Sequence, residues 1–164
     1  AFGDAILTIR QRGLAEAICE VAKAGRPVMG ICLGMQLLVD KSEESEGQQG
    51  LGLIPGQIVR LPENTREINS RFKIPNVGWS HLNRPEGVDW SDTILKRNNE
   101  KDFTYFVHSY HLDNKNSKHV LATQKFGGIQ SPSVIVRDNI SGCQFHPERS
   151  SDAGLNILKT WIEL

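Results

Sequence analysis

One cysteine of this chain has neighbours that favour nucleophilic chemistry. Cys32 stands between Gly30 and Gly34 in the pentapeptide GICLG, with apolar residues 27–29 before it and a periodic segment over 35–39 after it. This order predicts a strand, a sharp strained turn and a helix, an arrangement that raises a nucleophile above a sheet edge. The glycines let neighbouring backbone approach closely, and the helix N-terminus should lower the pKa of the thiol. A small buried cysteine that ends a core strand is the alternative.

A nucleophilic cysteine needs a base, and usually a third group that orients the base. His146 is the best candidate of the five histidines, because it follows the apolar stretch 140–145 and precedes Pro147 and Glu148. A His-x-Glu spacing at a strand end lets the carboxylate hold one imidazole nitrogen while the other nitrogen faces a thiol. Alone the tripeptide also fits a turn, but together with the cysteine it predicts a Cys-His-Glu triad.

The bulk composition excludes several classes of protein. The 164 residues suffice for one domain with a real core, and 19 basic residues balance 19 acidic ones. Zero net charge gives no electrostatic case for binding nucleic acid or a membrane surface. Three cysteines without close spacing argue against a disulfide framework and a zinc site, and favour the reducing cytosol. No apolar stretch is long enough to span a membrane.

Hydrophobic periodicity predicts a mixture of strands and flanking helices, and hence a single α/β domain over 1–164 without an internal repeat or long linker. We expect a helix over 3–24, interrupted at Gly13 and ended by Gly25, a second to about Asp40, and a third over 151–164 capped by Ser151 or Asp152. Loops are expected over 41–50 and 62–70. The predicted strands are 27–29, 57–60, a short one within 73–82 broken by Pro75 and Gly78, 102–111, 120–125, and a hairpin of 133–137 with 140–145.

Several segments, in order, resemble one enzyme family. They are GICLGMQLL, the acidic SEE, YFVHSY and GCQFHPERS, together with GLGLIPGQIVRL, IPNVGW and ATQKFGG. The chain resembles the class I, triad-type glutamine amidotransferases over nearly its whole length, and most closely the glutaminase subunits of imidazole glycerol phosphate synthase. The resemblance implies a three-layer, flavodoxin-like fold with a central mixed sheet.

The resemblance also implies roles for individual residues. Cys32 matches the nucleophile that attacks the side-chain amide of glutamine, His146 the base, and Glu148 the residue that orients the base. The N–H of Leu33 matches a donor to the oxyanion. Gln36 and Glu44 match residues that bind glutamine, with Glu43 as the alternative to Glu44, and the backbone of Ser109 and Tyr110 matches the strand end that holds the α-carboxylate. Arg149 matches a basic residue that faces the partner. His108 is expected to be structural.

The family uses no cofactor or metal, and it passes ammonia to a (β/α)8-barrel synthase subunit in a heterodimer. Its P-G-V-G segment supplies the second oxyanion donor, and this segment precedes the part that residues 1–4 resemble. We therefore expect the 164 residues to be an incomplete subunit that lacks the opening strands of the sheet. One lost oxyanion donor costs roughly 3 kcal/mol of transition-state stabilisation.

Three alternative functions remain open at this point. A paralogous amidotransferase subunit for surface-polysaccharide sugars would also use a barrel partner, and residues 69–82 do not decide between the two pathways. A module with a dead site that only stabilises its partner is a second alternative, against which the intact triad argues. A cysteine peptidase or thiol stress protein with the same elbow is a third, disfavoured by the His-Pro-Glu end.

Overall fold

The computed structural model describes residues 1–62, 73–113 and 117–164. Its helices are α1 (Phe2–Gln11), α2 (Leu14–Lys23), α3 (Leu33–Leu38) and α4 (Ser151–Ile162), with a 3-10 turn η1 (Pro147–Arg149). Its strands are β1 (Val28–Ile31), β2 (Lys41–Ser42), β3 (Gln57–Arg60), β4 (Asn76–His81), β5 (Phe103–His108), β6 (Tyr110–Leu112), β7 (Val120–Phe126), β8 (Ile129–Arg137) and β9 (Ile140–Cys143).

The strands form mixed sheets, which confirms the α/β class. The largest sheet has the order β1-β9-β8-β7, in which β1 and β9 run parallel and the other pairs antiparallel. Instead of one central sheet, the described residues also form a three-stranded sheet, β2-β3-β6, and a two-stranded sheet, β4-β5. The parallel pair matters most for the site, because it brings the ends of two distant segments to one edge.

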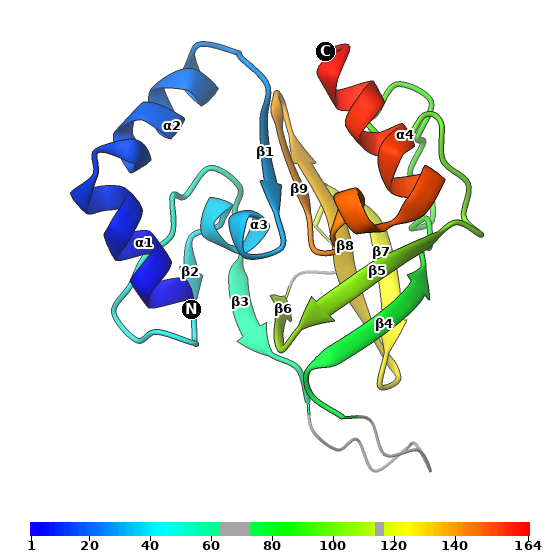
Figure 1. The fold of residues 1–164 in the computed structure, drawn as a ribbon, viewed down its shortest axis with the longest axis horizontal. Helices are drawn as coiled ribbons and strands as arrows, with labels where there is room; N and C mark the ends of the chain where they lie inside the picture. Colours follow the sequence, from blue (N-terminus) through cyan, green and yellow to red (C-terminus); the bar gives the residue numbers. More distant parts are fainter. Residues whose placement is uncertain (63–72, 114–116) are drawn as a thin grey trace.

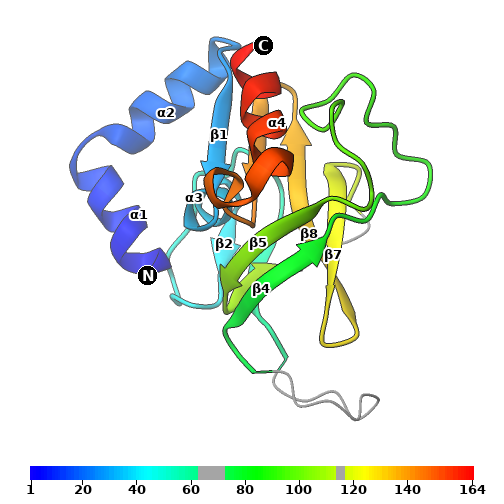
Figure 2. The same cartoon turned by 45° about the vertical axis from the view of Figure 1, so that its right-hand side comes forward.

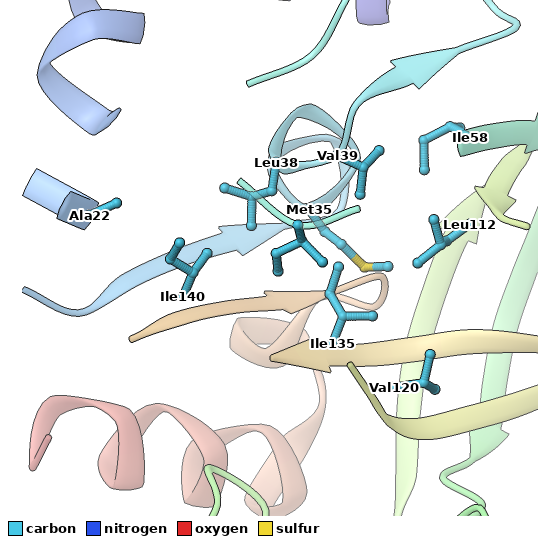
Figure 3. Close-up of a cluster of buried hydrophobic side chains, with 10 residues drawn as sticks. Ala22, Met35, Leu38, Val39, Ile58, Leu112, Val120, Ile135 and Ile140 are labelled. Carbon is cyan, nitrogen blue, oxygen red and sulfur yellow. The ribbon is translucent and has the colours of Figure 1, made fainter. Parts of the chain in front are cut away.

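Apolar side chains cover both faces of the four-stranded sheet. On one face, Met35 and Leu38 of α3 pack with Ile135 and Ile140 of β8 and β9 (Figure 3). On the other face, Ile157 of α4 packs in a cluster with side chains of β5, β7, β8 and β9. Helices therefore lie on both sides of the β1–β9 pair, with α1 and α2 across from α4 (Figure 1). Alternating side chains on β8 and β9 supply the two cores.

Gly13 interrupts the predicted N-terminal helix as expected and divides it into α1 and α2, because it takes a left-handed conformation with φ of 68°. Gly25 ends α2 as predicted. Its φ is 75°, its N–H donates to Ala22 O, and Arg26 N donates to Val21 O. This pair of bonds is the Schellman arrangement that satisfies the last carbonyls of a helix.

Several predicted boundaries were wrong. Gly78 lies within β4 and does not break it, and the predicted strand 102–111 is divided into β5 and β6 at Ser109. The expected loop 41–50 begins with β2, which pairs in parallel with β3. The N-cap of α4 is Ser150, one residue before Ser151, the nearer of the two predicted caps. Apart from Pro62, the predicted loop 62–70 lies outside the described residues.

None of the helices in the described part of the chain is long and apolar enough to cross a membrane.

Candidate active site

Cys32 occupies a strained turn between β1 and α3. Its φ of 51° and ψ of −107° lie where non-glycine residues are rarely found. A Cβ on Gly30 would come within 2.6 Å of Gly34 C and Met35 N, so glycine is required there. A Cβ on Gly34 would meet nothing within 4 Å. The prediction that both glycines permit close approach is therefore confirmed only for Gly30.

The parallel pairing of β1 and β9 brings the predicted base to the same edge of the sheet. Ile31 pairs with Cys143, and Cys32 N donates to Cys143 O at 2.7 Å. His146 follows three residues after Cys143, and its Nδ1 lies 2.7 Å from Glu148 Oε1. Because a carboxylate accepts, Nδ1 carries the proton in that bond and Nε2 remains available as a base.

Three further hydrogen bonds hold the His-Pro-Glu turn. Ser150 Oγ donates to His146 O at 2.6 Å and accepts from Tyr105 N at 2.9 Å, while His146 N donates to Tyr105 O at 2.9 Å. A Cβ on Gly154 would lie 1.8 Å from Pro147 O, so α4 packs directly against the turn. The imidazole is thus positioned by β5 and α4 as well as by Glu148.

The thiol of Cys32 bonds elsewhere than to the imidazole. Sγ lies 3.8 Å from Val107 O and 3.9 Å from Gln144 Nε2. Among the described hydrogen bonds, none joins Sγ to His146. Catalytic hydrogen bonds often tighten only when substrate is present, so this geometry is compatible with a resting site.

The prediction that the helix N-terminus lowers the pKa of this thiol was wrong. Burial raises the pKa of Cys32 above its ordinary value of 9.0, and the negative charge of Glu148 raises it further. The backbone N–H of Leu33 acts in the opposite direction, but it does not outweigh burial. α3 has only six residues, and desolvation disfavours the charged form of a thiol.

A cavity of about 300 Å³ opens beside the thiol, within the size range of small-molecule sites. The predicted glutamine-binding residues converge on it. Its lining includes Cys32, Leu33, Gln36, Glu44, Ser109 and Tyr110, along with Pro75, Val107 and His108. His146 and Glu148 do not line this cavity.

The structure distinguishes the two acidic candidates. Glu44 lines the cavity and accepts from Ala1 N and Phe2 N, both at 3.1 Å. Glu43 instead accepts from the backbone N–H of Arg60 on β3. Glu44 is therefore the carboxylate that faces the cavity and already accepts N–H groups.

His108 is held as a buried neutral group, as expected of a structural residue. Its Nδ1 donates to Tyr110 O at 2.9 Å, and its Nε2 accepts from Asn76 Nδ2 at 3.1 Å and Gln124 Nε2 at 2.9 Å. Burial lowers the pKa of His108 to about 4. The interaction ties β4, β5 and β7 together behind the cavity.

Other hollows among the described residues include two larger ones, with volumes of about 360 and 450 Å³. The lining of the first hollow includes Cys19 but no histidine, and the lining of the second includes no cysteine and no histidine. The chemistry therefore favours the smaller cavity at Cys32. Within the described residues, no group of three or more His, Cys, Asp or Glu side chains could hold a metal ion.

Comparison with known proteins places the chain in a family. The model of the class I glutamine amidotransferases matches residues 8–163. The chain belongs to the class I glutamine amidotransferases. Within that family it is 41% identical to the imidazole glycerol phosphate synthase subunit HisH of Geobacillus sp. over the whole chain and 74% of that protein. It is 42% identical to the HisH of Wolinella succinogenes over the whole chain and 77% of that protein. The chain is therefore a member of the HisH family.

Solved amidotransferases share the fold. One crystal structure of a glutamine amidotransferase matches 93% of this chain and 70% of its own, with a TM-score of 0.61 at 18% identity. At that identity the likeness supports the fold alone. It agrees with the mixed-sheet architecture described above.

This amidotransferase chain also has an exposed apolar surface next to His146. Trp79 and Val77 of β4 and Phe103 of β5 are 52%, 57% and 49% exposed. Arg149 Cζ lies 4.9 Å from the centre of the Tyr105 ring, and Trp79 meets the same ring edge-on at 5.8 Å. We call Val77, Trp79, Phe103, Tyr105 and Arg149 the β4–β5 face; Figure 2 shows β4 and β5 in front. Sequence reasoning found only Arg149, because which side chains of β4 and β5 reach the surface depends on how the two strands pack.

Sequence reasoning also missed Ser150 and Gln144 as parts of the site. Both lie inside GCQFHPERS, but a serine beside Ser151 gives no local sign that its hydroxyl bridges two strands. Gln144 is fully buried, and its contacts with Gln36 and Cys32 join residues more than a hundred positions apart.

Proposed function

We propose that the chain hydrolyses glutamine to glutamate and ammonia, with Cys32 as nucleophile, His146 as base and Glu148 as the group that orients the base. The observation that carries the proposal is the meeting of a strained cysteine turn and a His146–Glu148 pair at neighbouring ends of β1 and β9. Membership in the class I amidotransferases supports it.

In the first half-reaction, the thiol proton passes to His146 Nε2 and Sγ attacks the side-chain carbonyl carbon of glutamine. The oxygen gains the negative charge, and the N–H of Leu33 donates to it. The intermediate collapses as the C–N bond breaks, and the imidazolium gives its proton to the leaving nitrogen, which departs as ammonia. Water then attacks the thioester with His146 as base, which releases glutamate and restores the thiol.

The cavity residues provide complementary groups for the amino-acid end of glutamine. Glu44 would receive the α-ammonium group, since its carboxylate faces the cavity and accepts N–H donors. The backbone at Ser109 and Tyr110 would hold the α-carboxylate, and Gln36 would contact the bound substrate. No cofactor or metal is needed for these steps.

We further propose that the ammonia passes to a (β/α)8-barrel synthase subunit that makes imidazole glycerol phosphate in histidine biosynthesis, in the cytosol. The names of the relatives support this pathway over the surface-polysaccharide alternative. The β4–β5 face would meet that subunit, because exposed aromatic and arginine side chains are typical of interface centres. The β4–β5 face lies close to the proposed base, since the backbone of Tyr105 is hydrogen bonded to that of His146.

Glutaminase activity should be low without the synthase subunit. The thiol contacts Val107 O rather than the imidazole, and burial holds the pKa of Cys32 high, so little thiolate exists near neutral pH. Binding of the partner and its ligand should raise the activity.

The test is glutamate release from the protein with and without the synthase subunit. Wild type should release glutamate, and Cys32→Ala should release none above background, whereas Cys19→Ala should behave as wild type. Equal activity of wild type and Cys32→Ala in both conditions would overturn the enzymatic proposal in favour of a partner-stabilising module. High glutaminase activity that does not change when the synthase subunit is added would contradict the expected coupling between the two subunits.

A further inference from the structure

A chain of polar groups links a backbone carbonyl to the sulfur of Cys32. Gln36 Nε2 donates to Tyr110 O at 3.0 Å and to Gln144 Oε1 at 3.1 Å. Gln144 Nε2 in turn lies 3.9 Å from Cys32 Sγ. Gln36 and Gln144 are 5% and 0% exposed, and the hydrogen bond between their two amides is buried.

The direction of this chain follows from its first member. A backbone carbonyl only accepts hydrogen bonds, so Gln36 must present its NH2 group to Tyr110 O. The same NH2 group faces Gln144, which must therefore present its oxygen. The NH2 group of Gln144 is then the end that faces Cys32. Reversing either amide would set two acceptors or two donors against each other in a buried place, which is costly.

We propose that Gln144 is a hydrogen-bond donor to the sulfur of Cys32 that stabilises the thiolate formed during catalysis. The assignment rests on the proposed role of Cys32 as the nucleophile. A neutral N–H is well suited to this position, because burial and the charge of Glu148 both oppose a negative sulfur. In a poorly solvated site, a hydrogen bond to an anion is stronger than one between neutral groups.

The two neighbours of the sulfur then serve its two protonation states. The protonated thiol donates to Val107 O, and the thiolate accepts from Gln144 Nε2. Besides its proposed contact with the α-carboxylate of glutamine, Tyr110 affects the sulfur indirectly through this chain of hydrogen bonds. Its carbonyl fixes the orientation of both amides, although it is not itself in contact with the sulfur.

The pH dependence of Cys32 alkylation tests the proposal without using glutamine. Iodoacetamide reacts with the thiolate, and mass spectrometry of the Cys32 peptide separates this site from Cys19 and Cys143. In Gln144→Met, the midpoint of the alkylation profile should rise by about one pH unit, and the rate at pH 7 should fall about tenfold. Gln144→Asn keeps an amide that is one methylene too short, so its midpoint should also rise.

Gln124→Met is the matched control. It removes an equally buried amide that bonds to His108 and Asn76 but not to Cys32, so the midpoint should stay at the wild-type value. Thermal melting of each variant identifies those that fold. If Gln144→Met does not fold, the alkylation midpoint of Gln144→Asn tests the proposal.

An unchanged midpoint in a folded Gln144 variant would overturn the proposal. So would an equal rise in Gln124→Met, because the effect would then come from losing any buried amide. Because alkylation does not depend on glutamine turnover, a shifted midpoint in a protein that releases no glutamate would support the role of Gln144 while refuting the proposed function.

Discussion

At the residue scale, Glu148 acts on both the base and the nucleophile. Its contact with His146 should favour catalysis, whereas its negative charge disfavours the thiolate of Cys32. It holds His146 Nδ1 at 2.7 Å, and its charge raises the pKa of Cys32. Glu148→Gln keeps an acceptor oxygen but removes the charge that would stabilise imidazolium. The turnover of glutamine should therefore fall roughly 100-fold or more, while the alkylation midpoint of Cys32 should fall because thiolate becomes less unfavourable. Glutamate release measures the turnover, and the pH profile of iodoacetamide alkylation measures the midpoint of Cys32. A fall in turnover together with a higher midpoint would contradict this account.

At the scale of elements, His108 joins three strands in a way that should depend on pH. Asn76 on β4 and Gln124 on β7 both donate to its Nε2, so a proton on that nitrogen would break both contacts. The pKa of His108 is about 4 in the folded chain, against 6.5 as its ordinary value. The unfolded chain therefore binds the proton first as pH falls. Stability from this group is complete above pH 6.5 and is lost on the way down to pH 4.

Between pH 7 and pH 4.5 this one group should cost about 2 kcal/mol of unfolding free energy. Urea unfolding at the two pH values measures it. His108→Gln, which cannot take up a proton, should lose less stability over that interval than wild type does. A variant with the same acid sensitivity as wild type would show that other groups control it.

At the scale of the whole molecule, the β4–β5 face links a surface to the base. Trp79→Ala should weaken binding of the synthase subunit by roughly 30-fold or more, since a half-exposed tryptophan at an interface centre is a typical hot spot. Leu14→Ala is the control, because it removes a 46% exposed side chain on α2, across the molecule from β4 (Figure 1). Titration calorimetry with the synthase subunit compares the two. Equal affinities for both variants would place the interface elsewhere.

The sequence predicted most elements because their signals are local. Apolar periodicity located β3, β7 and α4 to within one or two residues, and Gly25 ended α2 through the conformation that only glycine adopts without strain. The boundaries that failed depend on pairing partners. β2 has two residues and exists because β3 lies beside it. Gly78 stays within a strand because β5 pairs along its whole length.

By itself, then, the sequence determined the class of fold, the family and the candidate triad, since each of these is carried by short motifs whose residue types suit the chemistry. Tertiary structure decided what those residues experience. Packing raised the pKa of Cys32 where the helix position alone predicted the opposite, chose Glu44 over Glu43 for the cavity, and brought Gln144 to the sulfur. Burial and the orientation of an amide arise from contacts between distant segments, and no local pattern of residues encodes them.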